Sequence, residues 1–451
     1  MIKGILAMIA AVTAVAGVVW GADLTPVGAE RGGNKDGTIP AWEGKLDVPV
    51  GGWSWGKFRG DYWRHKSEKP LFSIDASNVE KYKDKLSPGQ VQLIRQTKGY
   101  RMDVYPSHRN AAFPEFVLAN TRKNAGHARL SLDGAYLKEA YLPAVPFPAP
   151  KSGAEAIWNF MLRYQGVGFE YPGGAYTCLS PRPGSSEWIE AKGPQHNYFP
   201  CGKKGTTTPA QVGDVYYYIY FQYQNPPALA GQGLAQTWYF AKNNEAYYYF
   251  PGQRRVRRLP SAAYDTPQIG FENQYTFDQP YLLNGSIDRH DWKLVGKREM
   301  YIPYNSFGMF NFNQKLHDVA LPKYLRNESR RYELHRVWVV EGTVKKGMRH
   351  TEPKKVFYLD EDSWLAVAGE SYDARGALWK VRESYPIPVW ELGGSFASQP
   401  FVQYDLITGR YVFDQGAIGT GKDIRWLAET SDPRFKPGFF TADNLRARSE
   451  R

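Results

Sequence analysis

Hydrophobic and polar residues alternate in short runs along the second half of the chain, and the clearest series lies between residues 332 and 383. Its runs are rich in β-branched and aromatic residues and cover 332–341, 355–360, 364–368 and 377–383. Clusters of Gly, Asp and Ser separate the runs, a pattern typical of an antiparallel meander. Val337 and Val339 alternate with Trp338 and Val340, so this strand is apolar on both faces. Such a strand is covered on both sides or faces a lumen.

A second aromatic series, from residue 215 to residue 250, has the same two-sided character. Its first strand alternates between two ring-rich faces, Tyr216, Tyr218 and Tyr220 on one and Tyr217, Ile219 and Phe221 on the other. Either every ring packs in a two-layer core, or one face lines an apolar ligand cavity. For the second interpretation the candidate lumen residues are Tyr216, Tyr218, Tyr220, Trp238, Phe240, Trp338, Phe357 and Trp364.

The first third of the chain predicts helices and linkers instead. Ser77 is placed to cap a helix through residue 86, Ser87-Pro88 to open another through residue 98, and Ser152 to cap a third over 153–164. We divide the chain into a leader (1–21), an N-terminal arm and helical segment (22–150), and a curved antiparallel body with helical insertions (151–451). Residues 166–412 are expected to form one continuous sheet, and residues 22–451 one integrated domain.

The start of the chain predicts export. Lys3 is followed by an apolar run from Ile5 to Trp20 with small residues near its end, as in a secretory signal peptide cleaved near Gly21. Cleavage before Gly17 and a buried N-terminal helix are the alternatives. No later apolar run is long enough to span a membrane. We therefore expect an exported, periplasmic protein that does not span the membrane.

Charge narrows the range of partners. The formal net charge is +12, and removal of residues 1–21 takes away only Lys3. A basic exported protein is suited to anionic lipid headgroups, envelope glycans or an acidic partner, and nucleic acid is not expected. One strand concentrates this charge in Arg254, Arg255, Arg257 and Arg258. These guanidiniums either pair with carboxylates on neighbouring strands or capture a phosphate or carboxylate headgroup.

Cys178 and Cys201 are the two cysteines of the chain. In an oxidising compartment such a pair predicts a disulfide, and closing this loop contributes roughly 3 kcal/mol. A zinc pair and a nucleophilic cysteine are the weaker alternatives, because no further ligand lies beside either residue.

Motifs for catalysis are weak. Gly52-Trp-Ser54-Trp-Gly56 matches the nucleophile elbow without a strand before it and a helix after it, and residues 416–423 fall short of a phosphate-binding loop. The eight histidines are scattered, and none is paired with Glu at metal-ligand spacing. His290, between Asp288 and Asp291, is more consistent with a structural pair. We predict no catalytic residue, no metal and no cofactor.

Several longer motifs resemble the DUF1329 family, which is related at the level of the fold to the lipoprotein-sorting carriers LolA and LolB. The motifs are LTPVGAER (24–31), FPGQRRVRR (250–258), DRHDWKLVG (288–296) and YLDEDSW (358–364), together with residues 34–40, 300–304 and 332–338. The resemblance covers nearly the whole mature chain. It implies a mainly β fold with flanking α-helices, namely a large unclosed antiparallel β-barrel whose concave face is covered by helices.

The function predicted from these observations is that of a periplasmic, non-enzymatic carrier or chaperone for a hydrophobic or lipid-like ligand. The resemblance adds an inner-membrane exporter and an outer-membrane protein as possible partners. The alternative is a periplasmic enzyme that acts on envelope lipid or glycan. An outer-membrane barrel fits poorly, because the chain ends in a polar, basic segment and its first third is rich in helices and prolines.

Overall fold

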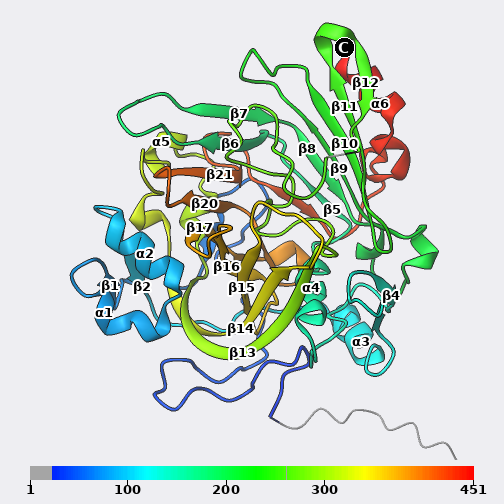
Figure 1. Ribbon diagram of the computed structural model, residues 1–451. Helices are drawn as coiled ribbons and strands as arrows, with labels where there is room; N and C mark the ends of the chain where they lie inside the picture. The colour runs from blue at the N-terminus through cyan, green and yellow to red at the C-terminus, as the bar shows by residue number, and fades with distance from the viewer. Residues whose placement is uncertain (1–22, 261, 451) are drawn as a thin grey trace, which may run out of the picture.

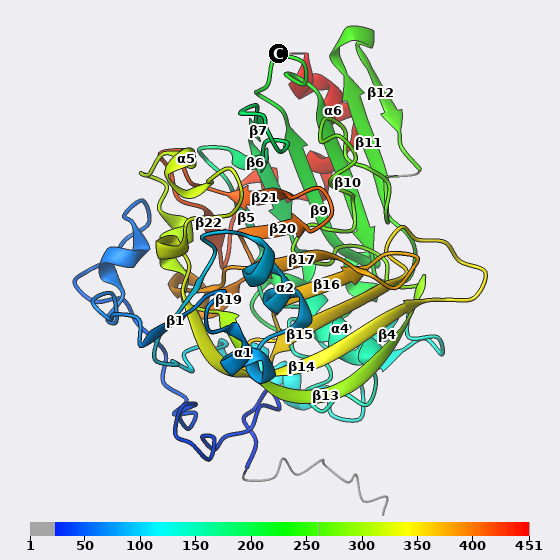
Figure 2. The same cartoon turned by 60° about the vertical axis from the view of Figure 1, so that its left-hand side comes forward.

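The computed structural model describes residues 23–260 and 262–450, so the predicted signal peptide lies outside the described part of the chain. Strands form two main sheets (Figures 1 and 2). The smaller sheet stands at the upper right of Figure 1, and the larger one curves through the centre and the bottom. Both sheets have free edges, so the predicted mainly β, unclosed architecture is confirmed.

The large sheet has eleven strands and contains the predicted meander. Its order is β1 (Phe72–Ile74), β2 (Met102–Val104), β14 (Tyr332–Val344), β15 (Lys354–Asp360), β16 (Ala366–Tyr372), β17 (Leu378–Ser384), β20 (Phe401–Asp405), β21 (Arg410–Gly416), β6 (Ala175–Leu179) and β7 (Ile189–Gly193), with β13 (His290–Pro303) also paired to β14. The ladders are antiparallel apart from the short contact between β2 and β14. The N-terminal segment thus adds β1 and β2 to the sheet of the body.

The small sheet has seven strands. Its order is β12 (Arg255–Arg258), β11 (Glu245–Phe250), β10 (Gly233–Tyr239), β9 (Val215–Gln222), β8 (Gln195–Tyr198), β5 (Gly168–Glu170) and β22 (Arg425–Leu427). Two ribbons complete the described strands, β3 (Arg129–Leu130) with β4 (Leu137–Glu139) and β18 (Ile387–Val389) with β19 (Ser395–Ala397).

One extended segment joins the two sheets. Pro194 alone separates β7 from β8, so the same stretch of chain contributes a strand to each sheet. The amide of Gln222 donates to the carbonyl of Pro194 (3.2 Å), and the amide of Gln224 donates to that of Lys192 (2.8 Å). Hydrogen bonds therefore continue across the junction. The sheet predicted as continuous over residues 166–412 is divided into two ladders that meet here.

Helices cover both faces of the large sheet. On the face turned toward the small sheet, which we call the inner face, α4 (Gly153–Met161) lies with Gly153 against the backbone of Trp292. Trp158 of α4 stacks on Phe240, just beyond β10, with 6.4 Å between ring centroids. On the outer face, the amide of Gly89 in α2 (Pro88–Gln96) donates to Glu370. The predicted helical cover is thus present as α4, and α2 adds a cover on the opposite face.

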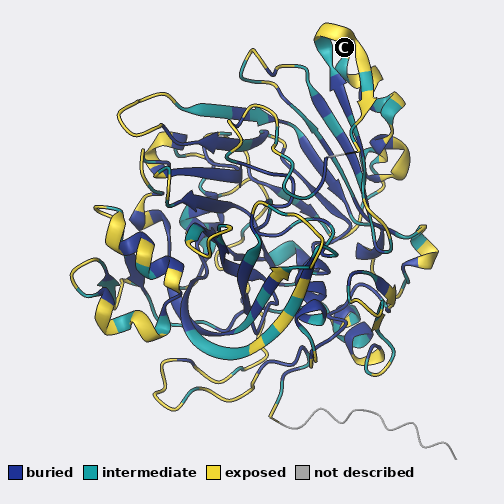
Figure 3. Ribbon diagram, viewed as in Figure 1, coloured by how far each residue is buried: buried dark blue, intermediate teal, exposed yellow. Residues whose placement is uncertain are grey.

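The caps of the helices agree in part with the sequence. Ser87 forms a capping box with Gln90 at the start of α2, and the Ser152 hydroxyl accepts from the amide of Glu155 in α4. The helix expected after Ser77 is a single turn, α1 (Val79–Tyr82), followed by the 3-10 turn η2 (Lys83–Lys85). The other helices are α3 (Glu115–Lys123), α5 (Leu316–Val319) and α6 (Ala442–Ser449). Figure 3 shows the buried residues concentrated in the two sheets and the exposed ones on α1, α2 and the β11–β12 hairpin.

The predicted disulfide between Cys178 and Cys201 is not formed. Cys178 lies in β6 with Phe413 and Glu190 as its cross-strand partners, whereas Cys201 lies in the 3-10 turn η3 (Pro200–Gly202) after β8. Both thiols are free and buried. Burial raises the pKa of Cys201 to about 12 and raises that of Cys178 further. Spacing along the chain suggested a pair, but the fold assigns the residues to separate elements.

Candidate functional site

A cavity of about 70 Å³ lies between the two sheets. Its first wall is the inner face of the small sheet, with Tyr217, Ile219, Phe221, Leu234, Gln236 and Tyr248. Its second wall belongs to the long connection between β12 and β13, with Gln268, Ile269, Phe271, Tyr275, Phe277, Pro280, Tyr281 and Asn284. Tyr223 and four polar residues, Thr177, Gln195, Asp414 and Gln415, complete the lining. Aromatic and aliphatic side chains thus predominate, as in many sites for small ligands.

The pleat of the small sheet decides which rings face the cavity. Phe221 of β9 pairs with Leu234 of β10, which pairs with Tyr248 of β11, which pairs with Arg257 of β12. Directly paired residues point to the same face of a sheet. An apolar row therefore runs across the inner face from the cavity wall to a guanidinium on the edge strand.

The opposite face of the small sheet is covered by the C-terminal segment. Tyr218 stacks on Phe440 with 5.1 Å between ring centroids, and Tyr220 packs edge-on against Phe439 at the same distance. Phe439 and Phe440 belong to a hydrophobic cluster that also contains Leu445 of α6. Tyr218 and Tyr220 therefore lie on the face away from the cavity.

None of the eight predicted lumen residues lines this cavity. Tyr216 and Phe240 pack together against α4, and the hydroxyl of Tyr216 donates to the carbonyl of Met161. The remaining four are buried or half-buried in the hydrophobic core, namely Trp238, Trp338, Phe357 and Trp364. The cavity is lined by the other set of β9 residues, Tyr217, Ile219 and Phe221. The predicted set of three tyrosines is divided near the β-bulge at the start of β9, because Tyr216 packs against α4 whereas Tyr218 and Tyr220 pack against the C-terminal segment.

The core positions of these four rings have local causes. Trp238 stacks on Tyr217, its cross-strand partner on the same face of the small sheet, with 6.1 Å between ring centroids. Trp338 stacks on Trp364, whose indole donates to the carbonyl of Val27 in the N-terminal arm (2.9 Å). Phe357 lies beneath Trp292, at 6.0 Å between ring centroids. The N-terminal arm and α4 thus fill the part of the inner face that the sequence had assigned to a ligand.

The polar end of the cavity is centred on Asp414 of β21. The hydroxyls of Thr177 and Tyr275 both donate to its carboxylate. Burial raises the pKa of Asp414 above its usual value. Beside it, the Gln195 amide donates to Gln415 Oε1 (2.9 Å), and Gln415 donates back to Gln195 Oε1 (3.2 Å). This cluster offers hydrogen-bonding groups to the polar end of an apolar molecule.

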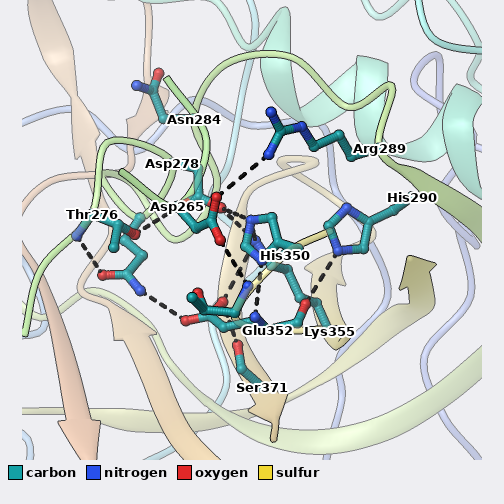
Figure 4. A network of polar contacts seen from close by, with 12 residues as sticks. Asp265, Thr276, Asp278, Asn284, Arg289, His290, His350, Glu352, Lys355 and Ser371 are labelled. Atoms are coloured by element: carbon teal, nitrogen blue, oxygen red, sulfur yellow. Dashed lines mark hydrogen bonds and ion pairs between the residues drawn. The ribbon is translucent and has the colours of Figure 1, made fainter. Parts of the chain in front are cut away.

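The connection between β12 and β13 forms the second wall, and we call residues 264–287 the plug loop. Its other side is fastened to the inner face of the large sheet by buried ions (Figure 4). Asp278 accepts from Lys355 Nζ (2.5 Å) and lies 2.9 Å from His350 Nε2. Burial opposes ionisation, but Lys355 and His350 outweigh it and hold the pKa of Asp278 well below its usual range.

A second carboxylate completes this network. Glu352 accepts from the Gln279 amide of the plug loop (2.7 Å) and from Arg382 of β17, and Lys380 Nζ lies 3.3 Å away. Against the cost of burial, these cations keep the pKa of Glu352 well below its usual value. His290 belongs here too: burial and Lys355 lower its pKa to about 3, so the ring is neutral near pH 7.

The candidate catalytic motifs stay without catalytic partners in the described part of the chain. Ser54 lies in a loop with no strand before it, and the next element is the short 3-10 turn at residues 59–62 instead of the α-helix of a nucleophile elbow. Asp423, at the end of the Gly-rich segment, accepts from Arg59 Nε (2.9 Å) in a buried ion pair. Asp288 accepts from the hydroxyl of Tyr264 (2.9 Å) in the plug loop. These residues serve packing and local pairing.

Sequence reasoning missed one grouping of histidines. His65 and His108, far apart in the chain, stack with 3.8 Å between ring centroids and share Glu68 as a partner. The i,i+3 spacing of His65 and Glu68 was the available signal, but His108 reaches them only through the fold.

A family model now identifies this architecture. The model described as a protein of unknown function, DUF1329, matches residues 73–446. The chain belongs to the DUF1329 family. The resemblance drawn from the sequence motifs is therefore confirmed.

Relatives of this DUF1329 member carry little functional description. It is 37% identical over 414 residues to an uncharacterized protein of Pseudomonas aeruginosa, across 90% of this chain and 88% of the relative. A crystal structure of a DUF1329 family protein from Desulfovibrio piger is similar over 64% of this chain and 98% of its own, with 12% identity and a TM-score of 0.43. A LolA superfamily protein from Nitrosomonas europaea is similar over 64% and 100%, with 11% identity and a TM-score of 0.35.

The predicted basic strand of the DUF1329 chain is the exposed edge of the small sheet. Arg255, Arg257 and Arg258 are exposed, and Arg258 lies 3.9 Å from Glu245 on the neighbouring strand. Arg254 has a left-handed backbone (φ 49°) and closes the turn before β12. Arg255 and Arg257 project on the side of the cavity, because Arg257 is paired with Tyr248. Among the described residues, no helix is long and apolar enough to cross a membrane.

Proposed function

We propose that this DUF1329 protein is a periplasmic, non-enzymatic carrier that holds a hydrophobic or lipid-like molecule against the inner face of its small sheet. The observation that carries the proposal is the row of paired residues Phe221, Leu234, Tyr248 and Arg257. With strands about 4.8 Å apart, the row is roughly 14 Å long. It offers apolar contact along its length and a cation at its outer end.

The chemistry of the row defines the ligand class. An apolar chain gains about 25 cal/mol per Å² buried against rings and aliphatic side chains, before entropic costs. A phosphate or carboxylate headgroup suits Arg255 and Arg257 at the exposed edge. A neutral polar group on the ligand suits Asp414, Gln415 and Gln195 at the inner end. The ligand is therefore amphipathic, and an anionic lipid or lipid-like molecule meets these requirements.

Loading requires movement of the plug loop. Pockets for drug-sized ligands measure about 300–1,000 Å³, whereas the cavity measures about 70 Å³. The side of the loop that faces the small sheet makes apolar contacts, with Phe271, Tyr275 and Phe277 among the lining residues. Those contacts are replaced by equivalent contacts with a bound chain. We propose that the ligand enters by displacing this side of the loop.

The periplasmic location rests on the amino-acid sequence of residues 1–21, and the partners rest on the family resemblance. In this proposal, an inner-membrane exporter delivers the ligand and an outer-membrane protein receives it. The exposed basic edge at Arg255 and Arg257 supports contact with anionic headgroups at the point of transfer.

Organic extraction of the purified full chain followed by mass spectrometry tests the proposal. We expect an amphipathic lipid to co-purify with the wild type. Phe221→Ser and Leu234→Ser should each lower the amount retained, by about three- to tenfold, because each removes part of a contact spread over many residues. Tyr218→Ser is the matched control on the opposite face and should retain the wild-type amount.

A panel of lipase and glycosidase substrates, assayed on the wild type and on Asp288→Asn and His290→Ala, separates a carrier from an enzyme. We expect no turnover. Turnover that is lost through one carboxylate or histidine substitution while binding persists would support the enzyme instead. Equal ligand retention in Phe221→Ser, Leu234→Ser and Tyr218→Ser would contradict the assignment of the binding face.

A further inference from the structure

A groove of about 340 Å³ lies apart from the cavity between the sheets and shares no lining residue with it. His65 and Glu68 line this groove and belong to the turn that follows η1 (Arg59–Tyr62). His108 comes from the extended segment after β2 and meets them there. Three metal-ligating side chains from two distant segments therefore converge, each of them half-buried.

The donor atoms are spaced as ligands on one side of a metal ion. His108 Nε2 lies 2.9 Å from Glu68 Oε1, and His65 Nδ1 lies 3.2 Å from the same oxygen. All three donors lie within 4.8 Å of one another. With bonds of about 2.0–2.2 Å to a tetrahedral ion, neighbouring ligand atoms stand roughly 3.3 Å apart. The side chains thus need little movement to bind an ion.

The surrounding residues hold the donors in place. Arg331 donates through Nη2 to Glu68 Oε2 (2.7 Å) and through Nε to Glu333 Oε1 (2.7 Å). The other oxygen of Glu333 accepts from the backbone amide of His108 (2.7 Å). Arg331 therefore occupies one oxygen of Glu68 and leaves Oε1 facing the two rings. Such outer contacts orient ligands and adjust their affinity for metal.

The types of side chain in this group also point to a transition metal. Two imidazoles and one carboxylate, with the groove beside them for a water molecule, form a donor set that suits Zn²⁺.

A second group of such residues, His335 with Asp360 and Asp362, differs in its balance of charge. Arg109 donates to both oxygens of Asp362, at 2.8 and 2.7 Å. That carboxylate is therefore already neutralised by a bidentate pair. In the group around Glu68, Arg331 pairs with Oε2 only, and Oε1 faces the two imidazoles, so this group is the stronger candidate.

We propose that His65, Glu68 and His108 form a binding site for a divalent transition-metal ion, with Zn²⁺ as the expected ion and with open coordination toward the groove. This site is independent of the proposed carrier cavity, because neither its residues nor its groove contribute to the cavity. Carrier function and metal binding can therefore each fail without the other.

Calorimetric titration of the untagged, chelator-treated full chain with ZnCl₂ tests this site, with Co²⁺ absorption as a spectroscopic readout. We expect one ion per chain and the visible bands of low-coordinate Co²⁺. Glu68→Gln and His108→Ala should each weaken binding by more than about a hundredfold, since changes to outer contacts alone cost ten- to a hundredfold. His317→Ala is the matched control, because His317 contacts a single carboxylate, that of Glu190, at 2.7 Å on the surface. It should bind as the wild type does.

The half-buried His65 provides a second ligand variant, His65→Ala, if His108→Ala does not fold as judged by circular dichroism. The proposal is overturned if the wild type binds no Zn²⁺ or Co²⁺. It is also overturned if binding persists in Glu68→Gln and in the folded histidine variant, because the ion then lies elsewhere. The contacts within the group would in that case be ordinary polar contacts between the two histidines and Glu68.

Discussion

The two sides of the plug loop are attached to the protein in different ways. Toward the large sheet, Asp278 and Gln279 bind a buried ionic network through Lys355 and Glu352. Toward the small sheet, the loop makes mainly apolar contacts around a cavity, with a hydrogen bond from the Tyr217 hydroxyl to Asn284 (2.5 Å). Directional, charged contacts lose most of their energy when one partner is removed, whereas apolar contacts can be exchanged for others. The ionic side is therefore the anchor, and the apolar side is the one that can open for a ligand.

The largest effect is expected from breaking the anchor. Lys355→Ala removes the ammonium next to Asp278 and leaves a buried carboxylate with His350 and the Thr276 hydroxyl as its remaining close partners. Loss of one partner of a buried ion pair costs about 3–5 kcal/mol. The free energy of unfolding, measured by urea denaturation, should fall by this amount.

Lys354→Ala is the control for that measurement. Lys354 precedes Lys355 in β15, but its ammonium is partly exposed and pairs with Glu341 at 2.8 Å. Surface pairs of this kind contribute about 0–1 kcal/mol. Equal losses in the two variants would show that the buried network does not anchor the loop.

The sequence could predict those parts of this comparison that depend on residues close together in the chain. The meander over residues 332–383, the caps at Ser87 and Ser152 and the alternation from Tyr217 to Phe221 in β9 are local patterns, and all three were predicted. The choice between Tyr217 and Tyr218 as cavity residues was beyond a local pattern. It depends on which face the C-terminal Phe440 covers, and that residue is more than two hundred positions away.

The anchor itself had no signal in the sequence. Two loops supply Asp278 and Glu352, and two strands supply Lys355 and Arg382; each residue alone has the pattern of an ordinary surface charge. The predicted disulfide was wrong for a related reason, because two cysteines at a permissive spacing belong to different elements. Contacts that depend on the packing of the whole chain were therefore missed, and motifs contained in one element were found.

The pH dependence of stability should have opposite signs on the two sides of the loop. The pKa of Asp278 is lowered in the folded state, so its contribution is present above the unfolded value of about 3.9 and is lost as the pH falls through the folded value. The pKa of Asp414 is raised, so its contribution is present below about 3.9 and is lost as the pH rises through the folded value.

Asn substitutions at both positions, followed by urea denaturation between pH 3 and pH 7, test these signs. Asp278→Asn should be less stable than the wild type at pH 7. The difference in the free energy of unfolding between the two should shrink as the pH falls toward the folded pKa. The free energy of unfolding of Asp414→Asn should increase relative to that of the wild type as the pH rises, by about 1 kcal/mol, the usual size of the effect of a single substitution. A gap of the same sign and pH dependence in both variants would contradict the distinction between an ionic and an apolar side.

The smallest effect is expected at the far end of the apolar row, where Arg257 meets solvent. Arg257→Gln should weaken binding of the chain to vesicles that contain anionic lipid, measured by co-sedimentation, by about 1 kcal/mol or roughly fivefold. The effect should diminish as salt is raised, because exposed charges are screened over about 10 Å at 0.1 M. Arg375→Gln is the control, since Arg375 is an exposed residue of a turn in the large sheet and pairs with Asp373. If both variants weaken binding equally, the net charge of the protein is responsible. If only Arg257→Gln does so, and the loss is confined to anionic lipid, the edge of the small sheet is where a headgroup meets the protein, and the apolar row behind it is the path for the chain.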